Sequence, residues 1–265
     1  MREKMAPNGF KHGLQIRQMQ LGIVAGMSDP YCTDVLGGAP FDWVLIDGEH
    51  SPGDPNSLLR QLQVLRGHRR EVAFRPGPHS RHPLGLWLDM GIRTFVFPNV
   101  ESADEAASLV GATRYPPAGR RGVGPALARA ADWGRREDYL DRANAEICVV
   151  AQIESSEGIA SIDRIAATQG IDGILVGPSD LAASVGHLGN HAHPEVKEAI
   201  ECIVRRTLAQ GKAAGMFVSD KASAQRHAKL GCTFLIVGTD TGFFAKVLDE
   251  TAVAFQAALA PAGPQ

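Results

Sequence analysis

The chain has 265 residues, which is long enough to bury a large core and fits one α/β barrel at least as well as two small domains. Its formal charge of −2 provides no field that would attract nucleic acid or an anionic membrane, so small-molecule chemistry is favoured. The four cysteines are widely spaced, and we find no secretory leader and no apolar run of about 20 residues, so we expect a cytoplasmic protein that does not enter a membrane.

Apolar runs with the character of buried strands recur after a polar, basic lead-in, which we expect to be loosely held, with Asn8 capping a short helix. Stretches of helical periodicity separate these runs, so strands and helices alternate. The alternation predicts one (β/α)8 TIM barrel over residues 1–265 with frayed termini, although periodicity does not distinguish it from an open parallel sheet. The predicted strands are residues 21–27, 41–47, 71–76, 92–98, 147–154, 171–177, 212–218 and 232–238.

Most predicted helices begin near a residue whose side-chain oxygen can accept hydrogen bonds from the free N–H groups of a helix start. Such residues mark the point where each strand–helix connection ends. They are Asp29, Asp54, Ser80, Ser102, Ser156, Ser219 and either Asp240 or Thr241.

One segment, residues 113–146, is too long for an ordinary connection between a helix and the next strand. Its start is rich in proline and glycine, which prevents regular structure, and its aromatic residues and the arginines at 120, 121, 135 and 136 could make a binding surface. A nucleic-acid-binding loop is disfavoured because the aromatic and basic residues are not interleaved. We therefore interpret this segment as an insertion with a functional role.

Polar residues follow several predicted strands where the strands end. In a (β/α)8 barrel these ends form one rim, so the residues meet in space. His50 is a candidate general base, because Asp47 lies close enough to accept a hydrogen bond from its ring and Gly48 allows a tight turn. The alternative for this stretch is a strand end with a few solvated charges. The rim residues are Asp47, Glu49, His50, Arg75, Gln152, Glu154, Gly177, Ser179 and Asp180.

Glu154 and Asp180 are candidate ligands of Mg²⁺, Mn²⁺ or Co²⁺, because two oxygen donors from different strands leave positions for water and a chelating substrate. Each carboxylate alone could equally be a helix cap. Arg75 lies in a buried strand and requires an anion, either the substrate or a salt bridge to Asp47 or Glu49. The N–H groups at Ser179 and Asp180 could bind a substrate carboxylate at the next helix start.

Other motifs are weaker. His187, His191 and His193 have a spacing that could suit zinc, but a glycine-rich loop just before a proline is more typical of solvated histidines. The chain contains no phosphate-binding loop and no dinucleotide fingerprint, so no organic cofactor is indicated.

Five stretches occur in the order and with the spacing of a known family. FDWVLIDGEH, AFRPG, TRYPPAGRRGVGPALARA, VAQIES and VGPSDLAASVG resemble the HpcH/HpaI family of metal-dependent pyruvate aldolases over residues 21–255, near the 4-hydroxy-2-oxoheptanedioate and 2-keto-3-deoxy-sugar-acid aldolase branch. The resemblance implies a barrel of the phosphoenolpyruvate/pyruvate-binding superfamily and a divalent metal. It also implies a hexamer, built as a dimer of trimers, in which subunits exchange the last barrel helix.

The resemblance also assigns roles residue by residue. It implies a class II aldolase that reversibly cleaves 4-hydroxy-2-oxo acids to pyruvate, or a related 2-oxo acid, and an aldehyde. Departures from the usual motif in the first helix, at residues 29–32 and 37–40, leave the aldehyde open. The implied residues are the base His50 with Asp47, the substrate-binding Arg75, the metal ligands Glu154 and Asp180, and the mid-barrel Asp89. From their places at the strand ends, we also expect Gln152, Gly177 and Ser179 to bind the substrate.

Three other functions fit the sequence less well. A Schiff-base aldolase needs a lysine at a strand end, and the seven lysines fall in termini, in predicted helices or at the opposite end of a strand. A lyase for CoA thioesters would need a groove for the nucleotide, of which the sequence gives no sign. A non-catalytic sugar-acid-binding protein is disfavoured by the intact His50 and the two carboxylates.

The insertion fits a loop that reaches a neighbouring subunit. We expect residues 120–128 to lie near the rim of an adjacent active site, with Arg121 and Leu127 shaping the pocket for the aldehyde, because a long aldehyde must project beyond the rim.

Overall fold

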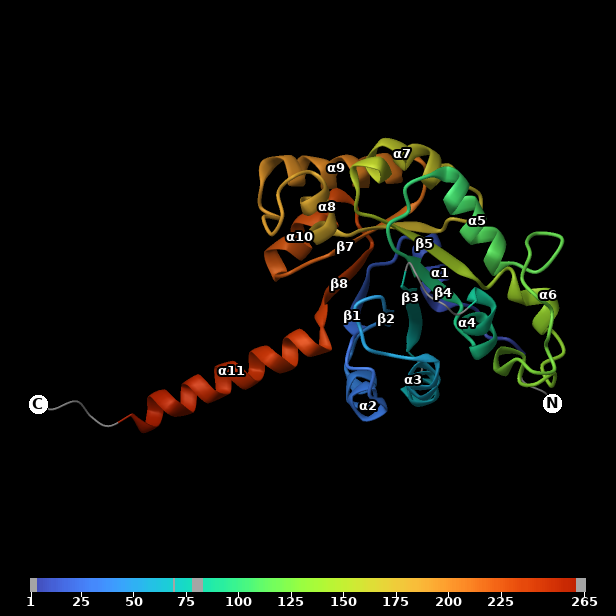
Figure 1. The fold of residues 1–265 in the computed structure, drawn as a ribbon, viewed down its shortest axis with the longest axis horizontal. Coiled ribbons are helices and arrows are strands. Elements are labelled where there is room, and N and C mark those ends of the chain that lie inside the picture. The colour runs from blue at the N-terminus through green and yellow to red at the C-terminus, as the bar shows by residue number, and fades with distance from the viewer. Residues whose placement is uncertain (1–3, 69, 78–82, 261–265) are drawn as a thin grey trace, which may run out of the picture.

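The fold was analysed in a computed structural model that describes residues 4–68, 70–77 and 83–260. Eight parallel strands follow one another around a closed barrel, with β8 paired to β1 (Figure 1). The predicted (β/α)8 barrel and its eight strands are therefore confirmed. The strands are β1 (Gln20–Ala25), β2 (Trp43–Gly48), β3 (Glu71–Pro76), β4 (Thr94–Phe97), β5 (Cys148–Ile153), β6 (Gly173–Val176), β7 (Ala213–Phe217) and β8 (Phe234–Thr239).

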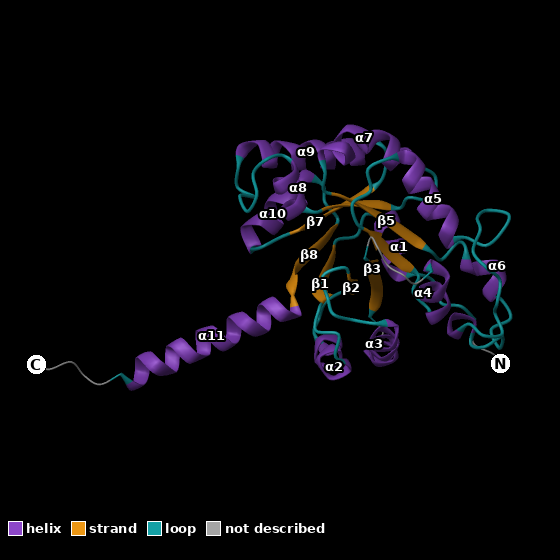
Figure 2. Ribbon diagram, viewed as in Figure 1, coloured by secondary structure: helices purple, strands orange, loops and turns teal. Residues whose placement is uncertain are grey.

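Helices surround most of the barrel (Figure 2). A continuous apolar core fills the space between the strands and this outer layer, which explains why the strand sequences are apolar on both faces. The helical elements are α1 (Gly9–Gln15), α2 (Pro30–Gly38), α3 (Pro55–His68), α4 (Leu84–Met90), α5 (Ala103–Thr113), η1 (Arg129–Ala131), α6 (Tyr139–Ala143), α7 (Ser156–Ala167), α8 (Pro178–Ser184), α9 (Pro194–Ala209), α10 (Lys221–Leu230) and α11 (Asp240–Leu259).

The side-chain caps of these helices agree with the prediction in part. Asn8, Asp29 and Ser102 cap α1, α2 and α5 as predicted, and Asp54 accepts a hydrogen bond from the Ser57 N–H at the start of α3. The predicted caps of α7, α10 and α11 were wrong by one or two positions. In each case a neighbouring residue has the extended backbone of a cap, and its side-chain oxygen accepts from the third N–H group of the helix. Those caps are Ser155, Asp220 and Thr239, in place of Ser156, Ser219 and Asp240 or Thr241; Ser80 lies outside the described residues.

The lead-in before β1 closes the N-terminal end of the barrel. Phe10 of α1 is 1% exposed, and its ring lies 4.7 Å from that of Trp43 and 5.7 Å from that of Phe234 inside the barrel. The expectation of a loosely held lead-in was wrong for this helix, because its apolar residues cover the open end of the barrel.

The insertion between α5 and β5 has an irregular beginning, as expected, and then η1 and α6. It contains a small core of its own, separate from the two barrel cores. This core shows that the insertion is a folded part of the chain and packs against the lead-in. Its buried members are Met5, Tyr115, Ala128, Ala131, Tyr139 and Ala143.

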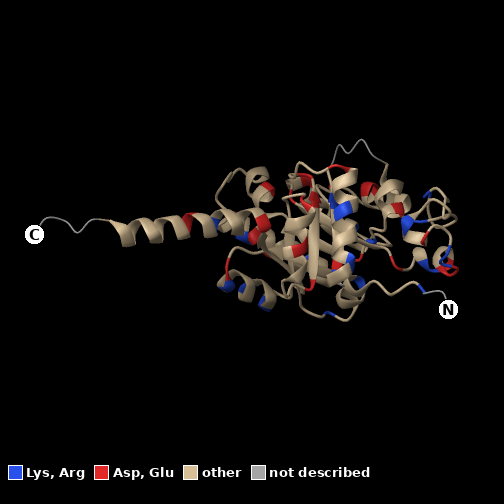
Figure 3. Ribbon diagram, turned by 90° about the horizontal axis from the view of Figure 1, so that it is seen from below, with Lys and Arg blue, Asp and Glu red and all other residues tan. Residues whose placement is uncertain are grey.

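The last helix differs from the others. α11 has 20 residues, none of them buried, and it projects away from the barrel (Figure 1). The helix leading to the C-terminus carries few charged residues (Figure 3). Within the described residues, none of the helices combines the length and the apolar character that a membrane crossing requires.

Candidate active site

The centre of the site is an ion pair between two neighbouring strand ends. Asp47 of β2 lies beside Arg75 of β3 in the register of the sheet. The Arg75 Nε and Nη2 donate to the two Asp47 carboxylate oxygens over 2.9 and 2.8 Å, and both residues are 6% exposed. A buried guanidinium needs such a partner, so the predicted salt-bridge alternative for Arg75 is realised.

Glu49 approaches the same guanidinium, with its Oε2 3.2 Å from the Arg75 Nε. Burial tends to raise the pKa of Asp47, but the hydrogen bonds and charge of Arg75 outweigh it and hold that pKa below its usual value. Burial does prevail at Glu49, whose pKa is raised despite Arg75. The two acids beside one arginine are therefore unequal, and Asp47 is the stronger acid.

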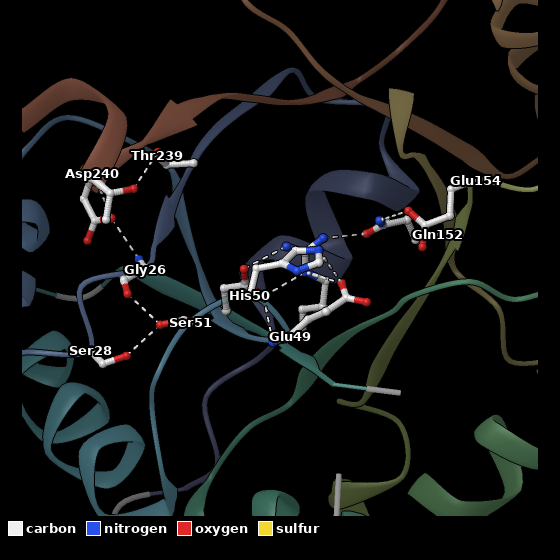
Figure 4. A network of polar contacts seen from close by, with 12 residues as sticks. Gly26, Ser28, Glu49, His50, Ser51, Gln152, Glu154, Thr239 and Asp240 are labelled. Atoms are coloured by element: carbon white, nitrogen blue, oxygen red, sulfur yellow. Dashed lines mark hydrogen bonds and ion pairs between the residues drawn. The ribbon is translucent and has the colours of Figure 1, made fainter. Parts of the chain in front are cut away.

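His50 lies at the surface of the site, with 65% of its side chain exposed. Its Nε2 is 3.6 Å from the Glu49 Oε2 (Figure 4). The expected hydrogen bond from the His50 ring to Asp47 is not among the contacts of the described residues, and both Asp47 oxygens accept from Arg75 instead. Glu49, expected from the sequence only as a possible salt-bridge partner of Arg75, is the carboxylate beside the imidazole.

A second set of polar residues continues from Arg75 to Glu154. The Arg75 Nη1 lies 3.4 Å from the Gln152 Oε1, and the Gln152 amide donates to the Glu154 Oε2. The Asn99 N–H donates to the other Glu154 oxygen over 2.8 Å. Burial raises the pKa of Glu154 to about 6, and the charges of Asp180 and Glu49 add to the rise. Gln152 thus links the arginine to a buried carboxyl group.

Gly177 leaves the space that the Glu154 carboxylate occupies. A Cβ at position 177 would lie 2.2 Å from the Glu154 Oε2, so any other residue would displace this side chain. Ser179 and Asp180 follow in the first turn of α8 and are exposed. The carboxylates at this rim repel one another, and the pKa of Glu154 is raised. Such a set of oxygen donors suits a divalent cation.

Asp89, expected at the active site, pairs with Arg121, expected near the site of a neighbouring subunit. Asp89 is on the outer helix α4, and its carboxylate accepts from the Arg121 Nη2 over 2.7 Å. The Arg121 side chain is 1% exposed; its guanidinium lies 4.2 Å from the Tyr115 ring and donates to the Tyr139 hydroxyl. Within one subunit these residues attach α4 to the insertion rather than join the rim.

Leu127 has a different environment, although it belongs to the same insertion. It is 89% exposed, and the nearby Val123 is 62% exposed. Its side chain is therefore free to contact another molecule, whereas the side chain of Arg121 is enclosed by its own subunit.

A further network lies behind the His50 loop and was missed by the sequence analysis. The Asp240 carboxylate accepts hydrogen bonds from the Gly26 and Met27 N–H groups over 2.8 and 3.2 Å. The Gly26 carbonyl in turn accepts from the Ser51 hydroxyl over 2.6 Å, and Ser51 also contacts Ser28 (Figure 4). Asp240 had been interpreted only as a helix cap, and no sequence signal relates it to residue 26.

The histidine cluster is only partly as expected. The rings of His187 and His193 stack with centroids 3.4 Å apart, and His187 pairs with Glu195 over 2.7 Å; these three residues place one donor atom each within 4.8 Å of one another. His191 is not a member. The His193 ring caps α9 by accepting from the Glu195 N–H, so a helix cap and an ion pair account for the arrangement.

Comparisons with known proteins show the family of the chain. The family model described as HpcH/HpaI aldolase/citrate lyase matches residues 20–246. A hydroxypyruvate/pyruvate aldolase of Deinococcus radiodurans is 47% identical over 94% of this chain and 90% of its own length. A 4-hydroxy-2-oxo-heptane-1,7-dioate aldolase of Escherichia coli is 42% identical over 94% of this chain and 95% of its own length.

The solved structures give the same result. A crystal structure of an HpcH/HpaI aldolase/citrate lyase family protein from Burkholderia cenocepacia superposes with a TM-score of 0.87 at 35% identity, over 96% of this chain and 100% of that one. The match includes the strand ends that carry Asp47, Arg75 and Glu154. The chain therefore belongs to the HpcH/HpaI aldolase/citrate lyase family.

Proposed function

We propose that the protein is a class II aldolase that reversibly cleaves 4-hydroxy-2-oxo acids into a 2-oxo acid, pyruvate or hydroxypyruvate, and an aldehyde. The observation that carries the proposal is the pairing of Arg75 with Asp47 beside His50, Gln152 and Glu154 on one rim. Relatives named as aldolases, with 42 and 47% identity over nearly the whole chain, support the same reaction class.

Arg75 binds the 2-oxo acid in this proposal. Its Nε and Nη2 are occupied by Asp47, whereas its Nη1 has only a long contact, 3.4 Å to Gln152, among the described residues. The Nη1 therefore has a donor available for a substrate oxygen. As cleavage proceeds, negative charge develops on the oxygen of the departing 2-oxo acid, and a buried guanidinium held in place by a salt bridge stabilises that charge.

His50 is the proposed general base. Its ring is exposed at the mouth of the site, so it can reach the 4-hydroxyl group of a bound substrate and accept its proton as the C3–C4 bond breaks. Glu49 lies beside the ring and favours the imidazolium that forms, because an adjacent carboxylate stabilises a positive charge. In the direction of synthesis, the same ring returns the proton to the new hydroxyl group.

The enzyme requires a divalent metal ion, as its family implies, and Glu154 and Asp180 are the residues that would hold it. The bound ion would act as a Lewis acid on the 2-oxo group. Gln152 orients the Glu154 carboxylate through a hydrogen bond, and the Asn99 N–H fixes the other oxygen. The exposed Asp180 leaves one side of this donor set open to substrate. We infer Mg²⁺, Mn²⁺ or Co²⁺ from the all-oxygen donors.

The proposal extends to assembly. We infer a homo-oligomer, a hexamer of two trimers, in which α11 packs against a neighbouring subunit; its exposed apolar residues support this. Leu127 would then contribute to the aldehyde pocket of the neighbour, and Asp89 and Arg121 would position the insertion that carries it. The single domain over residues 1–265 and the cytoplasmic location stay predictions.

A coupled assay tests the reaction. Pyruvate released from a 4-hydroxy-2-oxo acid is measured with lactate dehydrogenase, before and after treatment with EDTA and after restoration of Mg²⁺ or Mn²⁺. Metal-dependent release is expected. Full turnover in EDTA, or a pyruvate adduct trapped by borohydride, would contradict the class II mechanism. Binding of sugar acids without any release would assign the protein to the non-catalytic alternative.

A further inference from the structure

A cavity of about 680 Å³ lies away from the rim that carries His50 and Arg75. It is bounded by the C-terminal part of α3, by the beginning of β3, by residues 91–93 before β4, and by residues 129–136 of the insertion. The cavity contacts β3 and the segment before β4 at the N-terminal ends of these strands. It therefore lies toward the end of the barrel opposite the catalytic rim. Its volume is within the range of sites for small organic ligands.

The charge of this cavity is strongly unbalanced. Six of its lining residues are basic and two are acidic. The two acids are already engaged, because Glu71 lies 3.7 Å from the Arg93 guanidinium and Asp132 lies 3.8 Å from that of Arg135, which is outside the cavity. The basic residues are Lys4, Arg66, Arg70, Arg93, Arg129 and Arg136.

Arg129 is the cation in the least favourable environment. Its Nη1 donates to the Met90 carbonyl over 2.7 Å, and no carboxylate of the described residues lies within ion-pair distance of it. Burial, together with the positive charge of Arg66, lowers the pKa of Arg129. Arg129 thus experiences another positive charge and has no carboxylate partner among the described residues. An anion that enters the cavity would stabilise its guanidinium.

Arg136 gives a second, independent indication. Its Nη1 donates to the Ala130 carbonyl over 3.1 Å, but its Nε is buried and has no hydrogen-bond partner in the described part of the chain. A buried donor without a partner is destabilising, and ligand oxygens in the cavity could satisfy it. Arg66 is exposed at the edge and forms no ion pair with the described residues. The cations are thus distributed around the cavity rather than at one point.

We propose that this cavity is a binding site for a small organic anion that carries two or more carboxylate or phosphate groups. Guanidinium groups match such oxygens in bidentate geometry, and several of them around one cavity favour an anion with more than one charged group. Two of the cations, Arg129 and Arg136, belong to the insertion, so a bound anion would connect the insertion to α3 and β3. This site is separate from the proposed catalytic function and does not depend on it.

Calorimetric titration tests the proposal with two probes, citrate and fructose 1,6-bisphosphate, at constant ionic strength and with Mg²⁺ in molar excess over the titrant. Saturable binding of at least one probe is expected, and the tighter probe shows whether carboxylate or phosphate is preferred. Arg129→Gln should raise Kd about tenfold, because it removes charge-assisted hydrogen bonds to the anion. Arg66→Gln should raise Kd severalfold.

The matched control is Arg135→Gln, which removes the same charge from the adjacent exposed arginine outside the cavity and should leave Kd unchanged. Glu154→Gln should also leave it unchanged. Arg129 donates a hydrogen bond to the Met90 carbonyl, so its replacement can affect folding. Arg66 is exposed, so the Kd of Arg66→Gln reports on binding without that effect. Absence of saturable binding, equal Kd values in all the arginine variants, or loss of binding in Glu154→Gln alone would each overturn the proposal.

Discussion

Individual charges at the rim have different roles because their environments differ. Asp47 is fully committed to Arg75, with two hydrogen bonds and a depressed pKa, so it holds the arginine in position and is not available to take up a proton. Glu49 is held less tightly and lies beside His50. Of the two acids, Glu49 therefore takes up a proton more readily than Asp47.

Replacement of His50 tests its role as the base. His50→Ala should lower the rate of aldol cleavage by about 10²–10⁴-fold, because general-base catalysis contributes about that much. It should lower exchange of deuterium into pyruvate far less, since that exchange does not involve the 4-hydroxyl proton. The two rates are compared on one preparation; equal losses would give His50 another role. His12, on the helix at the far end of the barrel, provides a matched control as His12→Ala.

The raised pKa of Glu154 predicts how metal binding depends on pH. A proton competes with the metal for this carboxylate, whose pKa is about 6, so metal affinity should be nearly constant above pH 7 and fall about tenfold per pH unit well below pH 6. Calorimetric titration with Mn²⁺ between pH 5 and 8 measures this dependence. Glu154→Gln should bind the metal weakly at every pH, and Glu157→Gln on the exposed start of α7 should behave like the unmodified protein. An affinity independent of pH would contradict the role of Glu154.

At the residue scale, the sequence predicted which side chains gather but not always how they pair. Asp47, Arg75, Gln152 and Glu154 meet because strand ends in a closed barrel share a rim. The partner of His50 could not be predicted, because two acids lie within three positions of it and only the geometry at Arg75 decides between them. Burial is also what raises the pKa of Glu154, and the sequence does not state how deep a strand end lies.

At the scale of elements, Asp240, the first residue of α11, supports the loop after β1, which lies next to the loop that carries His50. Asp240 binds the backbone after β1, and this backbone binds Ser51, the residue after His50. Ser28 in the same loop has a φ of 54°, a left-handed conformation that costs free energy unless neighbouring contacts maintain it. The contacts of Asp240 and Ser51 provide that support, and we expect Asp240 to position His50 through them.

Asp240→Asn should lower kcat for aldol cleavage about tenfold, since it weakens two charge-assisted hydrogen bonds, and should leave KM for pyruvate in the synthetic direction nearly unchanged. It should also shift the pH profile of kcat, because the position of the His50 ring changes relative to Glu49. A purely structural role would not move that profile. Asp249→Asn on the same helix is the control, and a loss of equal size there would contradict a specific effect of Asp240.

The elements themselves were largely predictable. Long apolar runs define parallel strands because both faces are covered, and each of the eight runs contains an observed strand or overlaps one. Capping residues were less predictable where two candidates adjoin, as at Ser155 and Ser156, because the backbone conformation decides between them. The packing of α1 against the N-terminal end of the barrel was not predicted. A seven-residue helix is too short for its apolar periodicity to show which face is buried.

At the scale of the whole molecule, α11 carries apolar residues without a covering surface in its own subunit. Phe244 is 59% exposed and Phe255 is 67% exposed. Phe244→Glu should therefore reduce the size of the oligomer, because a carboxylate cannot be buried in an apolar contact. Sedimentation velocity measures the change. Lys246→Gln, an exposed charge on the same helix, should leave the oligomer intact. A monomeric parent protein with full activity would contradict the proposed assembly.

The projecting α11 also has a consequence for the kinetics of refolding. A chain whose barrel closes by itself regains activity at a rate independent of protein concentration. Here the helix that should cover β1 and β8 belongs, in the proposed assembly, to another chain, and encounter between chains becomes a necessary step. After dilution from denaturant, barrel formation should follow first-order kinetics. Activity should return in a later, second-order phase whose half-time halves when the protein concentration doubles.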